Sequence, residues 1–127
     1  MQQLVLLRGL PGSGKSTIAN LMTNFGFKHF EADMFFIDQD TWEYKFDPKL
    51  IPSAHEWCQK ATVRALEAGC DAVVSNTFTQ QWEMKFYKDY VNEHGIRIVE
   101  LVAKGNFPNV HGVPAESLQR MRDRWED

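Results

Sequence analysis

Eight residues near the start of the chain match the phosphate-binding pattern G-x-x-x-x-G-K-[ST]. The pattern begins at Gly9 and ends at Ser16, and Thr17 follows it. Glycines at such positions let the backbone N–H groups turn inward around phosphate oxygens. The lysine of the pattern reaches the β- and γ-phosphates, and its serine binds Mg²⁺. We therefore expect ATP and Mg²⁺ as ligands, contacted by Gly9, Gly12, Ser13, Gly14, Lys15, Ser16 and Thr17.

The flanking residues favour a nucleotide site over a surface glycine loop without a ligand. Residues 3–8 form an apolar run of strand length, and residues 15–24 are long enough for a helix. Ile18, Leu21 and Met22 lie on one face of that helix. A strand, a glycine loop and a helix in this order are the setting in which the pattern binds phosphate. The helix N-terminus adds positive charge at the same place.

The rest of the chain alternates between strand-like and helix-like segments. The further strands are predicted at 27–30, 71–76 and 96–103, and the further helices at 53–68, at 80–94 and from Pro114 onward. Ser53 is the expected N-cap of its helix, and Gly69 is the expected stop. Alternation of this kind is typical of α/β folds. We expect one domain over residues 1–127 with the three-layer P-loop NTPase fold, a mainly parallel sheet of about four to five strands with helices on both faces.

This topology predicts which polar residues lie near the phosphate loop. In open α/β sheets, ligands bind beyond the carboxyl ends of the strands. The polar residues directly after the other strands are Glu31, Asp33, Ser75, Asn76, Thr77 and Lys104. Asn76 and Lys104 are therefore further candidates for nucleotide binding. Asn76 and Thr77 orient a metal-bound water or contact a phosphate, or else they form a turn and cap a helix.

Asp33 is the best candidate for a catalytic group, together with Lys15. Phosphoryl transfer needs a phosphate cradle, a metal ion and a carboxylate that accepts the proton of the attacking hydroxyl. An acid just beyond the second strand can face the γ-phosphate from the acceptor side. Capping a helix from Met34 onward is the alternative role of Asp33, and the two roles are compatible. Glu31 is a weaker candidate, for which we expect a solvated turn position.

Metal ligation is expected from Ser16 and water, with Asp33 helping. Many P-loop enzymes hold the Mg²⁺ shell with an acid at the end of a neighbouring strand. The strand at 71–76 carries no acid at that end. Asp71 lies at its start, which is the wrong edge of the sheet.

Composition fits one small domain and limits the partners. The chain has 127 residues, 43% of them hydrophobic, with a net charge of −3. The charge argues against an extended nucleic-acid-binding surface but is compatible with a small site for a nucleic-acid end. No apolar stretch reaches the roughly 18 residues of a membrane span, and the start lacks the pattern of a signal peptide. Cys58 and Cys70 form no metal pattern and are expected to stay reduced, so we expect a cytoplasmic protein.

A group of aromatic residues follows Asp33. Its members are Phe35, Phe36, Trp42, Tyr44 and Phe46. We expect them to form a small core or a flap, because aromatic side chains dominate burial. Stacking on a base or sugar of the acceptor is the alternative.

Four segments together resemble the phosphate-loop polynucleotide kinases, of which the bacteriophage 5′-hydroxyl polynucleotide kinases are the best understood. They are the loop at 9–17, Ala-Asp-Met-Phe-Phe at 32–36, Ser-Asn-Thr at 75–77 with Trp-Glu-Met at 82–84, and His-Gly-Val-Pro at 111–114. Zeta-toxin-type kinases are more distantly similar. The resemblance covers nearly the whole chain. It implies transfer of the ATP γ-phosphate to a hydroxyl, with Asp33 as general base.

The acceptor half of the chain departs from this family. Met34 stands where a second acid is frequent, and Phe36 stands where the phage enzymes have a substrate-binding arginine. Lys104 is the nearest cation where a lid arginine is usual, and lysine offers a point charge rather than a bidentate fork. A polynucleotide 5′-hydroxyl is the first acceptor to consider. A sugar or nucleoside kinase, and a nucleotide-binding switch or slow ATPase, stay open as alternatives.

Overall fold

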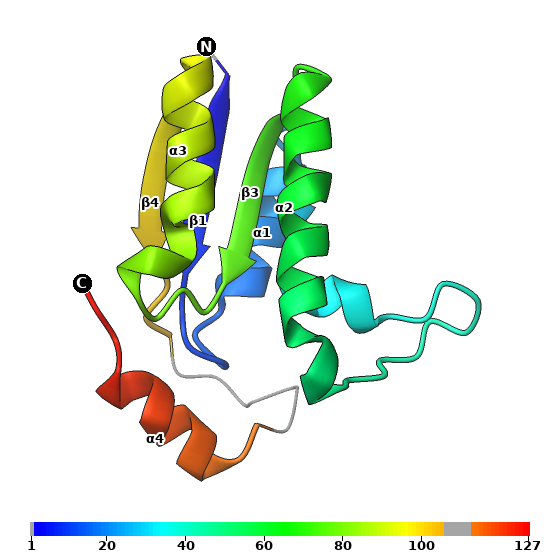
Figure 1. Ribbon diagram of the computed structural model, residues 1–127, viewed down its shortest axis with the longest axis vertical. Coiled ribbons are helices and arrows are strands. Elements are labelled where there is room, and N and C mark those ends of the chain that lie inside the picture. Colours follow the sequence, from blue (N-terminus) through cyan, green and yellow to red (C-terminus); the bar gives the residue numbers. More distant parts are fainter. Residues whose placement is uncertain (1, 106–112) are drawn as a thin grey trace.

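Four parallel strands form the sheet in residues 2–105 and 113–127, which the computed structural model describes. They are β1 (Gln3–Arg8), β2 (Phe27–Phe30), β3 (Asp71–Asn76) and β4 (Arg97–Val102), in the order β2-β3-β1-β4 (Figure 1). Leu4 of β1 pairs with Ala72 of β3 on one side and with Ile98 of β4 on the other. The predicted parallel sheet is confirmed, and β4 is one residue shorter at each end than expected.

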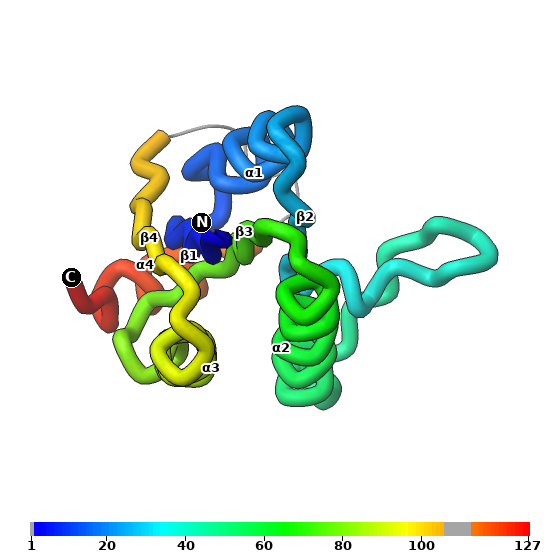
Figure 2. The backbone as a smooth tube through the Cα atoms, turned by 90° about the horizontal axis from the view of Figure 1, so that it is seen from above, coloured from blue at the N-terminus to red at the C-terminus, as the bar shows by residue number. Residues whose placement is uncertain are grey.

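Helices cover both faces of this sheet, as predicted. The α-helices are α1 (Lys15–Thr23), α2 (Ile51–Glu67), α3 (Lys85–His94) and α4 (Ala115–Asp123), and the 3₁₀ helices are η1 (Ala32–Phe36), η2 (Pro48–Leu50) and η3 (Gln81–Met84). Figure 2 shows α1 on one face and both α2 and α3 on the other. In Figure 1, α4 lies below the carboxyl ends of the strands. Within the described ranges, no helix combines the length and the apolarity that crossing a membrane requires.

The two sides of the sheet explain the unbroken apolar run in β1. Leu4 and Leu6 pack into the core beneath α2 and α3, whereas Val5 and Leu7 pack with Ala19 of α1 on the opposite face. These four consecutive side chains of β1 are all buried. A parallel strand that is covered on both faces needs apolar residues at successive positions rather than at alternate ones.

The helix α2 begins earlier than its sequence predicts. The expected N-cap, Ser53, lies inside the helix, because the 3₁₀ helix η2 leads directly into it. The side chain of Asp47 accepts a hydrogen bond of 3.0 Å from the backbone N–H of Lys49, so Asp47 caps this entry instead. Pro52 is tolerated because the first turn of a helix has no internal partner for its backbone nitrogen.

The predicted helix at 80–94 is divided into η3 and α3. Gln80 is the N-cap of η3, and its backbone N–H donates to Glu83 Oε2 over 2.9 Å, in a capping box. Gly95 ends α3 with a φ of 65°, a left-handed conformation that favours glycine. The segment after β3 therefore turns away from the sheet edge before α3 returns along the sheet.

Residues 37–47 form a hairpin-like loop that projects from one side of the molecule (Figures 1 and 2). An antiparallel bridge joins Ile37 to Tyr44. At its base, Phe36 is buried and its ring lies 5.1 Å from that of Phe46. Of the five aromatic residues expected to form a small core or a flap, Phe36 is buried and Phe35 is half-buried, whereas Trp42, Tyr44 and Phe46 are 77%, 42% and 50% exposed.

A buried arginine joins the end of β1 to the C-terminal segment. Arg8 is 1% exposed. Its Nε donates to the carbonyl of Phe78 over 3.0 Å, and its Nη1 donates to Glu100 Oε2 over 3.1 Å. Its Nη2 donates to the carbonyl of Glu126, and the guanidinium lies 4.5 Å from the ring centre of Trp125. One side chain thus ties the strand before the phosphate loop to residues at the other end of the chain.

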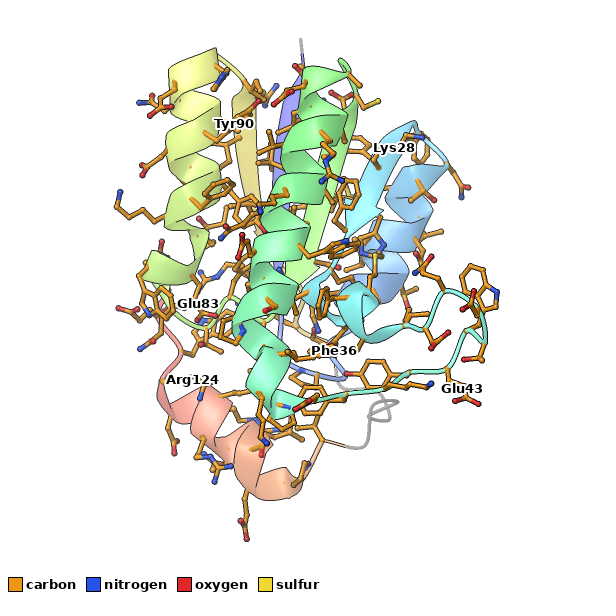
Figure 3. All side chains as sticks on the ribbon, turned by 45° about the vertical axis from the view of Figure 1, so that its right-hand side comes forward. Lys28, Phe36, Glu43, Glu83, Tyr90 and Arg124 are labelled. Carbon is orange, nitrogen blue, oxygen red and sulfur yellow. The ribbon has the colours of Figure 1, made fainter. Side chains whose placement is uncertain are left out.

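A second set of contacts fastens the end of α4. Arg124 Nε donates to Thr79 Oγ1 over 3.1 Å, and that hydroxyl donates to Glu83 Oε2 over 2.8 Å. Arg124 and Glu83 are labelled on neighbouring elements in Figure 3. The backbone N–H of Glu126 also donates to the carbonyl of Thr79. The loop between β3 and η3 therefore holds α4 near the carboxyl edge of the sheet.

Candidate active site

The phosphate loop follows β1 and turns directly into α1. Gly12 and Gly14 have φ angles of 84° and 88°, which side chains other than glycine rarely adopt. Gly14 is the N-cap of α1, and its carbonyl accepts from the N–H of Ile18 over 3.1 Å. The loop therefore lies at the positive end of the helix dipole, which favours a bound phosphate.

The first glycine of the loop stands where the surrounding atoms leave no space for a side chain. A Cβ atom on Gly9 would lie 2.3 Å from Ser13 Oγ and 3.3 Å from Ala103 Cβ. Ser13 Oγ is buried and has no hydrogen-bond partner in the described part of the chain. Tight backbone packing, two left-handed glycines and a buried hydroxyl without a partner fit a loop that is shaped to enclose an anion.

Replacing Gly9 by alanine is expected to weaken ATP binding at least tenfold. The added methyl group would collide with Ser13 Oγ and lie tight against Ala103 Cβ, so Ser13 and the loop around it must shift. Fluorescence titration with a nucleotide analogue measures the effect. Adding Ser13→Ala removes the closest contact and should restore part of the affinity. Unchanged affinity in the Gly9→Ala single variant would contradict the proposed loop geometry.

Glu31 lies in the site rather than in a solvated turn, so that expectation is wrong. Ser16 Oγ, in the first turn of α1, donates to Glu31 Oε1 over 3.0 Å. The Glu31 side chain is 14% exposed. The reason is the shortness of β2, which ends at Phe30 and brings the next residue directly against α1. Glu31 thus contributes a carboxylate beside the hydroxyl that the loop pattern assigns to Mg²⁺.

His29 supports Glu31 from the strand behind it. Its Nε2 lies 3.4 Å from Glu31 Oε1 and 2.6 Å from Ser75 Oγ, at the end of β3. Burial lowers the pKa of His29 to about 4, so the ring is neutral at neutral pH. The sequence analysis gives this histidine no role. Its position two residues before Glu31, on a short strand, was the one signal that the two side chains lie together.

Asp33 lies in the first turn of η1, and Glu31 is the N-cap of that 3₁₀ helix, so the alternative role of Asp33 as a helix cap is wrong. Its side chain is half-buried, and Oδ1 accepts a hydrogen bond of 3.1 Å from the hydroxyl of Tyr44. Burial, followed by the charge of Asp33, raises the pKa of Tyr44 to about 12. Tyr44 therefore stays protonated and orients the carboxylate from the hairpin-like loop.

The charges of two carboxylates, Glu31 and Asp33, act on Lys15. Burial lowers its pKa, and the negative charges of Glu31 and then Asp33 oppose that effect. Lys15 is the first residue of α1, directly after the phosphate loop, and the two carboxylates come from the segment after β2. Their coupling across two loops is the arrangement that the carboxyl-edge argument predicted.

Asn76 and Lys104 have different surroundings. Asn76 is buried, and its Oδ1 accepts from the backbone N–H of Ala32 over 2.9 Å, which positions the start of η1. Lys104 is exposed, and the N–H of the next residue, Gly105, donates to the carbonyl of Ser13 over 2.9 Å. The ends of β3 and β4 thus adjoin the site. Nucleotide contacts by Asn76 and Lys104 stay predictions, as does the role of Thr77, and the segment at 106–112, which includes His111, lies outside the described residues.

The oxygen donors present fit a Mg²⁺ ion that is bound together with nucleotide phosphates. Among residues 2–105 and 113–127, no three His, Cys, Asp or Glu side chains are grouped as a metal cage. Mg²⁺ in phosphoryl-transfer enzymes needs no cage, because one or two protein oxygens, substrate phosphates and water complete its shell. Ser16 and the neighbouring carboxylates supply such oxygens.

Residues 4–105 match a family model that is described as an AAA domain. The chain belongs to this AAA domain family. The match covers the phosphate loop, Glu31, Asp33 and the end of β4 in one continuous stretch.

The AAA domain is similar to proteins of several kinds. NEDD4-binding protein 2 from Homo sapiens is 34% identical over 140 positions, which cover 97% of this chain but only 8% of that protein. A chain of the Pnkp1/Rnl/Hen1 complex is 20% identical with a TM-score of 0.61, covering 94% of this chain and 38% of that one. An APS kinase from Mycobacterium tuberculosis, solved with AMPPNP and APS, is 15% identical with a TM-score of 0.59, covering 94% of this chain and 67% of that one.

These similarities confirm the P-loop kinase-like fold that the sequence predicts. The AAA domain spans well under half the length of NEDD4-binding protein 2 and of the Pnkp1/Rnl/Hen1 chain. The structural neighbours include a sugar kinase and an APS kinase, and at identities of 16% and 15% they report on the fold.

Proposed function

We propose that this AAA domain transfers the γ-phosphate of ATP to a hydroxyl acceptor. One observation carries the proposal: the two residues before Asp33 are each fastened to a different part of the site. The Glu31 carboxylate accepts a hydrogen bond from the hydroxyl of Ser16 in the phosphate loop, and the backbone N–H of Ala32 donates one to Asn76 Oδ1 at the end of β3. These two hydrogen bonds fix the chain just before Asp33, which supports its proposed role as the general base.

The residues divide into a donor half and an acceptor half. In the donor half, the loop N–H groups and Lys15 stabilise the charge that spreads over the transferring phosphoryl group. For Mg²⁺, which would neutralise further phosphate charge when bound, we propose Ser16 as a ligand. In the acceptor half, Asp33 accepts the proton of the attacking hydroxyl as the new O–P bond forms and ADP leaves.

For the acceptor, we propose a polynucleotide 5′-hydroxyl. The resemblance to polynucleotide kinases supports it, as does the similarity to the Pnkp1/Rnl/Hen1 assembly, which is also described as an RNA repair complex. Near Asp33, the stacked rings of Tyr44 and Phe46, with centres 6.3 Å apart, offer an aromatic surface of the kind on which a terminal base stacks.

A small-molecule acceptor, a sugar or nucleoside, is the second candidate because of local charge. The hairpin-like loop at 37–47 carries four acidic residues, Asp38, Asp40, Glu43 and Asp47, against a single lysine, Lys45. Such a surface repels the phosphates of a long nucleic acid, whereas a neutral sugar or nucleoside meets no such barrier. The net charge of −3 acts in the same direction.

Incubation with γ-labelled ATP and Mg²⁺ tests the proposal, with 5′-hydroxyl DNA, 5′-hydroxyl RNA and a pool of sugars and nucleosides offered separately. Label on a nucleic-acid end is the expected result, and Lys15→Ala is expected to abolish it. Label only on small molecules would replace the first acceptor by the second. Label only in free phosphate, with every acceptor, would contradict a kinase and indicate an ATPase or a nucleotide switch.

A further inference from the structure

The strand β3, which lies beside β1, does not end in the acid that often holds the metal shell in P-loop enzymes. β3 ends in Ser75 and Asn76, and neither side chain carries a charge. Asp71, the one acid in this strand, lies at its opposite end and accepts a hydrogen bond of 2.8 Å from the backbone N–H of Gln3. A carboxylate that serves the metal must therefore come from another element.

Glu31 meets the geometric requirement for that carboxylate. Its Oε1 lies 3.0 Å from Ser16 Oγ. Two neighbouring ligands of an octahedral Mg²⁺ ion, each about 2.0–2.1 Å from the metal, are about 2.9 Å apart. The hydroxyl and the carboxylate oxygen are thus already spaced as two adjacent ligands of one ion, with little movement required of either side chain.

The surroundings hold Glu31 in this position. His29 Nε2 lies 3.4 Å from the same Oε1 and 2.6 Å from Ser75 Oγ. The His29 side chain is 6% exposed, and Ser75 is fully buried. Side chains that contact a metal-binding carboxylate from behind fix its direction and strengthen the site. The end of β3 therefore acts on the metal site through His29 and Ser75, rather than through an acid of its own.

We propose that Glu31 and Ser16 together bind the Mg²⁺ ion of the bound nucleotide, with His29 and Ser75 as positioning residues. The inference deepens the proposed function and rests on it, because it assigns the metal of the same nucleotide site. It differs from the sequence-based expectation, in which Asp33 helps to hold the metal. In this assignment, Asp33 acts only on the acceptor hydroxyl, and Glu31 binds the metal ion of the nucleotide.

Binding measurements with ADP test this assignment without any acceptor. A fluorescent ADP analogue is titrated with Mg²⁺ to find the concentration that gives half-maximal tight binding, and free Mn²⁺ is followed by electron paramagnetic resonance. Glu31→Gln is expected to raise the half-maximal Mg²⁺ concentration at least tenfold and to weaken Mn²⁺ binding, with nucleotide affinity in EDTA unchanged. Ser75→Ala should cause a smaller shift in the same direction.

Glu43→Gln is the matched control, since Glu43 is exposed on the hairpin-like loop (Figure 3). Circular dichroism and thermal melting verify that every variant is folded. An unchanged Mg²⁺ requirement in Glu31→Gln, a shift in Asp33→Asn instead, or nucleotide binding that never depends on Mg²⁺ would each overturn the inference. A chain that needs Glu31 for metal-dependent ADP binding but phosphorylates no acceptor would contradict the proposed function alone.

Discussion

Replacing Asp33 by asparagine is expected to lower the rate of phosphoryl transfer by about 10²–10⁴-fold, which is the usual contribution of a general base. Asparagine keeps the size of the side chain and can still contact the Tyr44 hydroxyl, but it cannot accept the proton of the acceptor. ATP affinity should stay within about twofold, because the phosphate loop and α1 are untouched. Single-turnover transfer and nucleotide titration on the same preparation measure the two quantities separately.

Asp89→Asn provides the control for this loss, because it makes the same chemical change on an exposed residue of α3, outside the hairpin-like loop. Its transfer rate should equal that of the unmodified chain. A transfer rate in Asp33→Asn within threefold of normal would rule out Asp33 as the base. Loss of ATP binding together with transfer would instead give Asp33 a role in the donor half.

Replacing Arg8 by alanine is expected to lower the free energy of unfolding by about 3 kcal/mol. The change leaves the buried carbonyl of Phe78 without its donor and removes the ion pair with Glu100. It also empties the space beneath Trp125. Urea unfolding, followed by tryptophan fluorescence and by circular dichroism, measures the loss.

Arg120→Ala is the comparison for this effect, since Arg120 is exposed on α4 and should change stability by less than about 0.5 kcal/mol. Arg8→Met, which restores volume without donors, should recover only part of the loss. Proteolysis of Arg8→Ala should begin in the C-terminal segment, because the contact of Arg8 with Glu126 is gone. A loss below about 1 kcal/mol would show that the arginine is not a structural link.

The sheet and the phosphate loop could be predicted from the sequence because their signals are local. An apolar run such as 3–8 has few alternatives to a buried parallel strand, and the glycine pattern is specific at each position. The topological rule then placed Asp33 near the loop without any coordinates. Helix starts were less predictable, since Ser53 is a good cap by type but η2 delivers the chain into α2 before it.

The role of Glu31 could not be inferred in the same way, because it depends on a contact between segments. A glutamate after a short edge strand looks like a solvent-exposed residue until α1 is packed beside it. Arg8 is similar. A charged residue at the end of an apolar strand suggests exposure, yet its partners come from residues 78, 100 and 126. Only the folded chain brings those partners together.

The hairpin-like loop at 37–47 is a separate segment on which the proposed acceptor site can be varied. Two backbone hydrogen bonds lie within it, from the N–H of Asp38 to the carbonyl of Glu43 and from the N–H of Trp42 to the carbonyl of Asp38, and η1 and η2 flank it. The phosphate loop, Glu31 and their supporting strands lie outside it. Under the proposed function, we expect that grafting this segment from one member of the AAA domain family onto another would change the acceptor preference and leave the phosphate loop unchanged. Under the proposed function, natural variation in this loop would alter the choice of acceptor while the phosphate loop stays unchanged, as long as the Tyr44 hydroxyl that donates to Asp33 is kept.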